Sequence, residues 1–177
     1  ERDKLYQHLK NGEGDIVAAN ICISLSNIHD IKYSTPFYTS PQVLIQRKGK
    51  PIKSIEELDK KTVYVRKNSS FQKRLEYLED EVGIDINIKV YQGDPITDDL
   101  IELVDKGVID FTVAHENLGR ISKDLFSNID VSTVLSFPQK IAFALRNSST
   151  SLDKKLNSFL INYTKSSEFA LLKKRYF

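Results

Sequence analysis

The residues best suited to chemistry directly follow an apolar run from Val108 to Ala114, where the sequence continues with His115, Glu116 and Asn117. A histidine titrates near neutrality and could exchange a proton with a neighbouring carboxylate. Adjacent side chains on a strand point to opposite faces, however, so they rarely act on one proton. Because no serine or cysteine stands in a nucleophile motif such as GxSxG, we expect no catalytic set. The residues leave two interpretations open for the cluster, a ligand site or the polar end of a strand that meets water.

A second cluster, Arg66 to Ser70, joins a predicted strand to a predicted helix. Ser69 and Ser70 would begin that helix, where free N–H groups and the helix dipole favour an anion. The alternative is a capping box between Ser69 and Gln72, and the two roles are compatible. Ligands gather at the carboxyl ends of strands in α/β sheets, which adds Asn20 to the candidates.

An aromatic group surrounds Pro36 and consists of Tyr33, Phe37 and Tyr38. Such a group packs a core or a loop, or it walls a cleft, and the sequence leaves both open.

Composition excludes several classes of protein. The 177 residues carry 26 Lys and Arg against 24 Asp and Glu, without the basic stripe that nucleic-acid binding requires. One cysteine allows no intrachain disulfide, and three histidines far apart predict neither a metal site nor a cofactor. No apolar run approaches the roughly 20 residues that cross a membrane.

Hydrophobic periodicity predicts helices and strands in alternation, and hence an α/β fold with largely parallel sheets. Helices are expected up to residue 10, at 54–61 with Ser54 as N-cap, at 68–83, at 94–107 with Thr97 as N-cap, at 118–125, and at 151–176 with a break at 165–167. Strands are expected at 15–23, 42–47, 62–67, 86–92, 108–114 and 139–147.

The sequence also contains a faint internal echo. "LKNGEGDIVAAN" and "LVDKGVIDFTVAHEN" each place an apolar residue, then Gly three later, then Asp three after that, then a strand. Two similar α/β lobes are the natural interpretation.

"GEGDIVAAN", "IKYSTPFYTSPQVLIQRKG" and "IEELDKKTVYVRKNSSF" together resemble the bacterial extracellular solute-binding proteins of family 3. More narrowly, "QGDPITDDLIELVDKGVIDFTVAHEN" and "SFPQKIAFALRNSS" resemble the solute-binding domain of membrane-bound lytic transglycosylase F-like proteins. The resemblance implies a two-lobe periplasmic-binding-protein type II fold with two crossing hinge strands. Lobe one would comprise residues 1–44 and 144–177, lobe two residues 45–143. The family opens with a strand, a helix and a strand before the position of Glu1, so lobe one is expected to be N-terminally truncated.

The resemblance also implies a ligand site in an interlobe cleft. Amino-acid-binding members grip the ligand carboxylate with an arginine, where this chain has Asn27, and its ammonium with an aspartate, where it has His115. The amino-acid clamp is therefore expected to be missing. The implied ligand-binding residues are Asn20, Ser24, Asn27, Tyr38, Arg66, Ser69, Ser70, His115 and Glu116.

By the same resemblance we expect a non-catalytic ligand-binding or sensor domain of a periplasmic, or outer-membrane-anchored, envelope protein. Its partners would be a small polar ligand, such as an amino-acid-like molecule, a peptide or a peptidoglycan fragment, and a covalently linked transglycosylase domain. No cofactor, no metal and no nucleic acid are expected. The alternatives are a transport-linked solute-binding protein and a cyclohexadienyl-dehydratase-like enzyme, for which the sequence shows no catalytic set.

Overall fold

The computed structural model describes residues 4–23, 31–49, 51–93 and 95–176. The chain divides into two compact units, Glu1–Ser40 with Gln139–Phe177 (unit 1) and Pro41–Pro138 (unit 2). The sequence placed these boundaries at 44/45 and 143/144, which lie inside the strands β4 (Gln42–Arg47) and β9 (Gln139–Arg146). In the structure each of these strands pairs within a single unit, and a proline stands at each crossing.

The sheet of unit 2 has the strand order β6-β5-β7-β4-β8. Its further strands are β5 (Thr62–Val65), β6 (Asn87–Val90), β7 (Phe111–His115) and β8 (Ile129–Asp130). β5 is parallel to β6 and β7, whereas β4 is antiparallel to β7 and β8. The expectation of largely parallel sheets was therefore wrong, because an apolar pattern locates a strand and carries no information on its direction.

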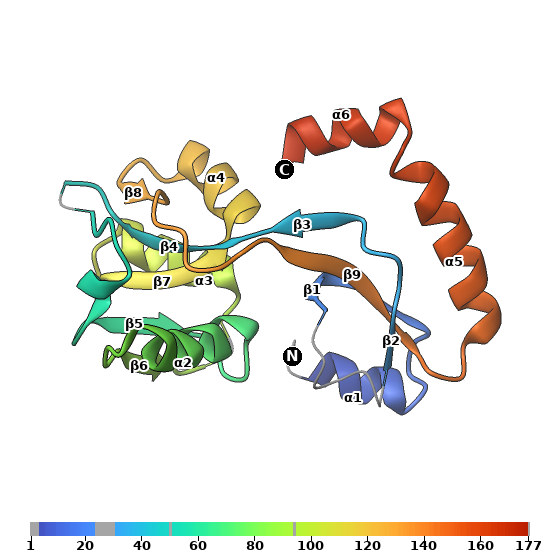
Figure 1. Cartoon of the computed structure of the whole chain (residues 1–177), viewed down its shortest axis with the longest axis horizontal. Coiled ribbons are helices and arrows are strands. Elements are labelled where there is room, and N and C mark those ends of the chain that lie inside the picture. Colours follow the sequence, from blue (N-terminus) through green and yellow to red (C-terminus); the bar gives the residue numbers. More distant parts are fainter. Residues whose placement is uncertain (1–3, 24–30, 50, 94, 177) are drawn as a thin grey trace. The chain divides into compact units, whose positions relative to one another are not determined.

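Helices cover both faces of this sheet, and Figure 1 shows the three layers. One face packs on α2 (Ser70–Val82), the other on α3 (Thr97–Asp105) and α4 (Glu116–Leu125). Neighbouring residues of β4 alternate between the two cores, with Leu44 in the first and Val43 and Ile45 in the second. A strand buried on both faces explains the continuous apolar run that the sequence shows there.

The helix predicted at 68–83 is confirmed, and local chemistry sets its ends. The hydroxyl of the N-cap Ser69 accepts from Gln72 N at 3.2 Å, and Gly83 ends α2 with a φ of 75°. Two neighbouring predictions were less accurate. Thr97 is the first residue of α3, whereas the sequence predicted it as the N-cap. The segment 54–61 forms only the 3-10 turn Glu56–Leu58, and its N-cap is Ile55 instead of the predicted Ser54.

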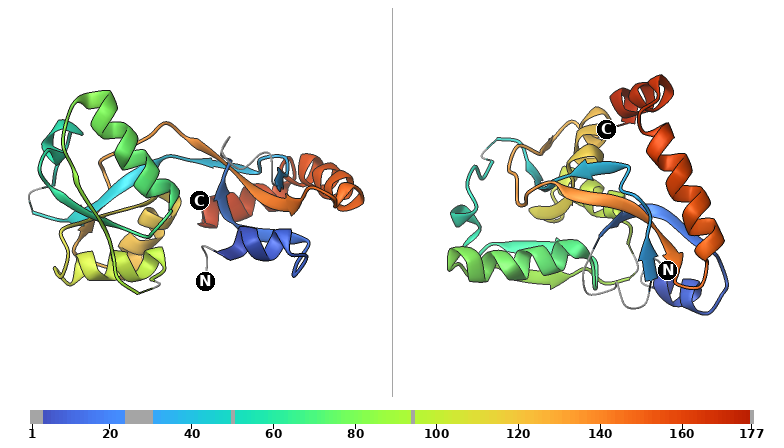
Figure 2. Two further views of the ribbon diagram at one scale, coloured as in Figure 1. Left: turned by 90° about the horizontal axis from the view of Figure 1, so that it is seen from below. Right: turned by 45° about the vertical axis from the view of Figure 1, so that its right-hand side comes forward.

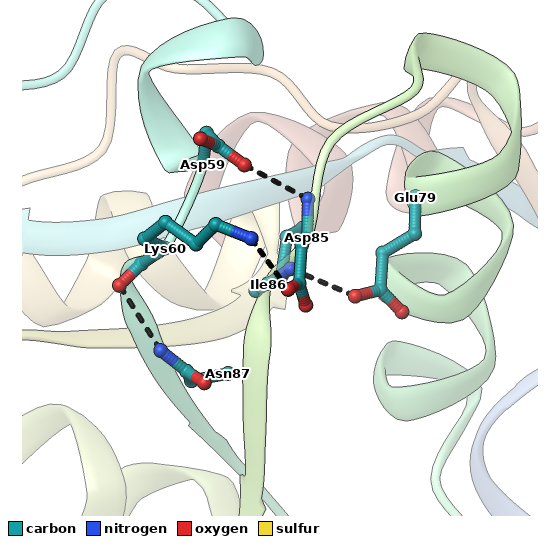
Figure 3. A network of polar contacts seen from close by, with 6 residues as sticks. All are labelled: Asp59, Lys60, Glu79, Asp85, Ile86 and Asn87. Atoms are coloured by element: carbon teal, nitrogen blue, oxygen red, sulfur yellow. Dashed lines mark hydrogen bonds and ion pairs between the residues drawn. The ribbon is translucent and has the colours of Figure 1, made fainter.

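A polar network fixes the turns at the edge of unit 2 where β5 and β6 begin (Figure 3). Lys60 Nζ pairs with Asp85 Oδ2 at 2.6 Å, and Asp59 Oδ1 accepts from Asp85 N at 3.0 Å. Glu79 of α2 accepts from Ile86 N at 2.7 Å. These bonds tie the end of α2 to the starts of two strands, at the edge of the sheet opposite the carboxyl ends of β5 and β7.

Unit 1 is built around β9, which pairs antiparallel with β1 (Ile16–Cys22), β2 (Ile31–Tyr33) and β3 (Tyr38–Ser40). The short helix α1 (Leu5–Lys10) covers one face through a small core that contains Leu9, Val17 and Ile21. The predicted C-terminal helical region is confirmed as α5 (Thr150–Tyr163) and α6 (Ser167–Tyr176), with the expected break between them. Figure 2 shows both helices from two further directions.

The sequence echo corresponds to a repeated structural unit. α1 leads through Gly12 into β1, and α3 leads through Gly107 into β7, with φ values of 80° and 71° at the two glycines. Each following strand pairs antiparallel with a strand that ends in an arginine, β9 with Arg146 and β4 with Arg47. A Cβ added at either glycine would meet the guanidinium of that arginine. The two units therefore share a helix–glycine–strand motif that is packed in the same way.

Candidate ligand site at one edge of unit 2

The structure brings two of the predicted clusters together. β5 and β7 are parallel neighbours, with Tyr64 opposite Thr112, and the Thr112 hydroxyl donates to the Tyr64 carbonyl at 2.8 Å. Both strands therefore end at the same edge of the sheet, where β5 continues into Arg66 and β7 ends at His115. An edge formed by the carboxyl ends of parallel strands is where α/β proteins place ligands.

The segment after β5 is held in shape by its own hydrogen bonds. Asn68 adopts a left-handed φ of 55°, and its N–H donates to the Gln72 side chain at 3.1 Å. The predicted capping box is thus only half formed, because Gln72 reaches Asn68 instead of the N-cap Ser69. Ser69 is buried while Ser70, the first residue of α2, is exposed. Ser70 is the serine better placed to contact a ligand.

His115 ends β7 as a buried side chain. Its ring packs edge-to-face on Phe71 of α2, with 5.1 Å between the ring centroids. Glu116 starts α4 immediately afterwards, and its N–H donates to the Pro41 carbonyl at 2.9 Å. The aromatic contact fixes the imidazole on the α2 face of the sheet, beside the start of α2.

The sequence missed two residues at this edge, Gln42 and Ser136. Gln42 lies opposite His115 because β4 runs antiparallel to β7, so the start of β4 meets the end of β7. Its N–H donates to the Ser136 hydroxyl at 2.9 Å, and its buried side-chain oxygen has no hydrogen-bond partner in the described part of the chain. A search limited to the carboxyl ends of strands cannot find a residue at the beginning of one.

The edge combines a half-buried guanidinium, serine hydroxyls, an amide oxygen and the starts of two helices. Helix starts offer free N–H groups and positive dipole ends, which bind carboxylates and other anionic groups. Glu116 adds one carboxylate that can meet a donor of the ligand. These groups are of the types that hold a small polar molecule without a covalent bond, which makes this edge the candidate ligand site.

The remaining predicted site residues lie in unit 1 or outside the described residues. Tyr38 opens β3, opposite Ile141 of β9, and Asn20 belongs to β1. Ser24 and Asn27 fall in 24–30, outside the described residues. Of the nine predicted ligand-binding residues, the structure thus gathers Arg66, Ser69, Ser70, His115 and Glu116 at one edge.

Two other properties concern the described residues. Among them no group of three His, Cys, Asp or Glu side chains could hold a metal ion. None of the helices over these residues has the length and apolarity needed to cross a lipid bilayer.

Two α/β units that the chain connects twice, with ligand-type chemistry at the strand ends of one, define a two-unit binding protein. The comparison with protein families gives the particular family. Residues 1–177 match the bacterial extracellular solute-binding proteins, family 3, and the chain belongs to that family. The predicted family is confirmed, and the match makes the chain a solute-binding domain and not a catalytic one.

Curated relatives carry a narrower name. The chain is 29% identical over 176 residues to the membrane-bound lytic murein transglycosylase F of Desulfosudis oleivorans, covering 99% of the chain and 38% of the relative. It is also 29% identical over 177 residues to the protein of that name from Photobacterium profundum, covering 98% and 34%. The chain thus spans little more than a third of the length of these relatives.

Solved structures share the fold. An ancestral arginine-binding protein bound to arginine superposes with a TM-score of 0.82 at 20% identity, over 99% of this chain and 77% of its own. An amino acid ABC transporter substrate-binding protein from Streptococcus pneumoniae bound to L-arginine gives 0.84 at 17%, over 99% and 73%. These likenesses confirm the predicted fold class, an α/β fold of the type of periplasmic amino-acid-binding proteins.

Proposed function

We propose that this chain is the solute-binding domain of a lytic-transglycosylase-F-like envelope protein, and that it binds a small polar ligand at the edge formed by β5 and β7. The observation that carries the proposal is the convergence of Arg66, Ser70, His115 and Glu116 at that edge. Membership of an extracellular solute-binding family and the names of the curated relatives support a periplasm-facing location.

The ligand we propose is an amino-acid-like or peptide fragment of peptidoglycan with at least one carboxylate. Arg66 and the start of α2 can neutralise a carboxylate of the ligand. Removing one charged hydrogen bond from such a site lowers the binding free energy by about 1.5–3 kcal/mol. By the family resemblance, His115 and Asn27 stand at positions where amino-acid-binding members have an aspartate and an arginine. The clamp that this resemblance implies for a free α-amino acid is therefore absent, and we propose a larger ligand whose carboxylate meets Arg66 and the start of α2.

Calorimetry with purified chain tests the proposal against a panel of free amino acids and muropeptides. We expect a muropeptide to bind, and Arg66→Ala to weaken it by about 10- to 100-fold through the lost charged bond. Lys67→Ala is the matched control, because it removes the adjacent, exposed cation and should change the affinity less than about twofold. Tight binding of a free amino acid, or equal effects of the two variants, would contradict the proposal.

The finer role we propose is that of a sensor. A ligand that binds one conformation of this domain more tightly than another shifts the domain toward the tighter-binding conformation, by an amount set by the difference in affinity. A linked catalytic domain could respond to that shift. Peptidoglycan turnover by the full-length protein should then respond to the muropeptide, and the response should be lost in Arg66→Ala. Unchanged turnover in the presence of bound ligand would argue against the sensor role.

A transport-linked binding protein is the second candidate, favoured by a solved neighbour described as an amino acid ABC transporter substrate-binding protein. The gene neighbourhood separates the two. A permease and an ATPase beside the gene favour transport, whereas a transglycosylase domain in the same reading frame favours the sensor.

A further inference from the structure

The first residue of β4, Gln42, has a polar side chain that unit 2 buries without satisfying it. Gln42 is 3% exposed, and its side-chain oxygen, Oε1, has no hydrogen-bond partner among the described residues. Its main chain is fully bonded, since its N–H donates to the Ser136 hydroxyl at 2.9 Å and its carbonyl accepts from Leu135 N at 2.8 Å. Because a buried amide oxygen without a donor destabilises a fold, we expect the donor to come from outside the fold.

Gln46 on the same strand shows how unit 2 satisfies a glutamine that serves the fold alone. Side chains alternate along a strand, so Gln42, Leu44 and Gln46 lie on one face of the sheet. Gln46 is 1% exposed, and its side chain both donates to the Ile52 carbonyl and accepts from Ile52 N. The two glutamines share strand, face and burial. Only the one opposite the end of β7 has an oxygen without a donor, which indicates a ligand for Gln42.

The groups around the Gln42 side chain are neutral or positive. Leu44 belongs to the core that packs on α2, so Gln42 faces α2 as well. His115 lies opposite Gln42 in the pairing of β4 with β7, and its ring packs on Phe71 in the first turn of α2. The start of α2 is the positive end of its helix dipole. Glu116 follows His115 but begins α4, which covers the other face of the sheet.

This environment selects among the donors that a ligand could bring to Oε1. An ammonium group that approaches a buried, neutral amide oxygen loses its hydration without gaining an opposite charge. The positive end of α2 adds repulsion. An acylated nitrogen carries an N–H and no charge, and a hydrogen bond to Oε1 replaces the one it gave to water. The donor that fits is therefore the N–H of an acylated amine.

We infer that Gln42 is a specificity-determining residue, whose side-chain oxygen accepts the N–H of an acylated nitrogen in the ligand and discriminates against the free amine. The inference rests on the proposed function, because it takes this edge of unit 2 to be the ligand site. It narrows the ligand to a molecule with a carboxylate and an acylated nitrogen. N-acyl amino acids and acidic N-acyl amino sugars share this chemistry.

Calorimetry with two matched pairs of compounds tests the inference. One pair is N-acetyl-L-alanine and L-alanine, and the other is N-acetylmuramic acid and muramic acid. Within each pair the carboxylate is the same and only the acyl group differs. We expect the acylated member of at least one pair to bind at least tenfold more tightly than the free amine. The pair that shows this preference identifies the amino acid or the sugar as the source of the acylated nitrogen.

Two substitutions of Gln42 and one control assign the preference to its side chain. Gln42→Leu should weaken binding of the acylated compound about tenfold and change that of the free amine less than twofold. Gln42→Glu should move the preference at least tenfold toward the free amine, because a carboxylate compensates an ammonium. Gln92→Glu adds the same charge at an exposed residue that follows β6 at the same edge, and should change the preference less than twofold. Thermal unfolding verifies that each variant is folded.

Three results would overturn the inference. One is equal binding of the two members of both pairs, or tighter binding of the free amines. Another is a folded Gln42→Leu variant that binds the acylated compound as the natural protein does. The third is failure of all four compounds to bind. Titration with the muropeptide then decides the proposed function separately, because a muropeptide that binds without this preference contradicts the role of Gln42 alone.

Discussion

The two units differ in how completely the same motif is enclosed. In unit 2 the strand after the motif lies inside a five-stranded sheet, with a helical layer and a buried core on each face. In unit 1, as far as the structure describes it, the corresponding strand stands at an edge, and a small core lies between it and α1. One local sequence pattern thus gives a motif whose stability depends on its neighbours.

Because the two units have separate cores, truncating a core side chain in one unit should destabilise that unit and leave the other protected. This is the largest effect that we expect. Leu9 in α1 and Val104 in α3 occupy the same place three residues before the motif glycine, and both are fully buried. Leu9→Ala should cost about 3 kcal/mol and Val104→Ala about 2 kcal/mol of unfolding free energy. Exchange measured by unit should show that Leu9→Ala opens α1 and β1 and leaves β7 protected. Equal loss of protection in both units would contradict their separate cores.

The second prediction compares the two ends of β4, the one near the candidate site and the one remote from it. Gln46 donates to the Ile52 carbonyl at 2.9 Å and accepts from Ile52 N at 2.8 Å, whereas the side-chain oxygen of Gln42 has no such partner. Gln46→Leu leaves the Ile52 N–H unsatisfied, at a cost of about 1–3 kcal/mol. Gln42→Leu should cost less than about 1 kcal/mol, because no hydrogen bond of its side-chain oxygen is lost.

Chemical denaturation of both variants, with ligand titration, checks this pair. Gln46→Leu should lower the unfolding free energy and leave the ligand affinity unchanged. Gln42→Leu should change the ligand affinity and leave the unfolding free energy nearly unchanged. A large stability loss in Gln42→Leu would show that the edge is structural.

The third prediction concerns the motif glycines themselves. Gly12→Ala and Gly107→Ala should each cost about 1 kcal/mol, since an L side chain is strained at a positive φ. Both new methyl groups would meet a guanidinium. Arg47 is exposed and can move, while Arg146 is held by Asp15, so Gly12→Ala should cost slightly more. Thermal unfolding measures both, and a neutral Gly12→Ala would remove the likeness between the two motifs.

The elements of this fold were largely predictable from the sequence, because their signals are local. The capped, amphipathic pattern from Ser69 to Gly83 needs nothing beyond its own residues, and the Leu9–Gly12–Asp15 spacing identifies the motif without its neighbours. Strand direction was not predictable, because β4 reads the same whether it lies parallel or antiparallel to β7. The candidate site was found in part for the same reason. Arg66 and His115 follow strands in the sequence, whereas Gln42 reaches the site only through antiparallel pairing.

The smallest expected effect compares one carboxyl group from each unit under acid conditions. In unit 2, burial raises the pKa of Asp130, but hydrogen bonds from Ser132 and Gln46 outweigh it and hold this pKa below its usual value. In unit 1, the hydrogen bond with His8 lowers the pKa of the exposed Glu13. A carboxyl group whose pKa is lowered in the folded state stabilises the fold at pH values above its unfolded-state pKa, which is about 4. This stabilisation is lost as the pH falls through the folded-state pKa.

Asp130→Asn should therefore reduce stability at neutral pH, and its difference from the natural protein should shrink as acid protonates the natural carboxyl. Glu13→Gln should show the same direction with a smaller amplitude, because solvent screens an exposed pair. Thermal unfolding of both variants between about pH 2 and pH 7 covers the window in which these carboxyls titrate. A difference that grows on acidification would reverse the sign expected for Asp130. A larger effect of Glu13→Gln than of Asp130→Asn would mean that the carboxylate in unit 1 contributes more to stability than the one in unit 2.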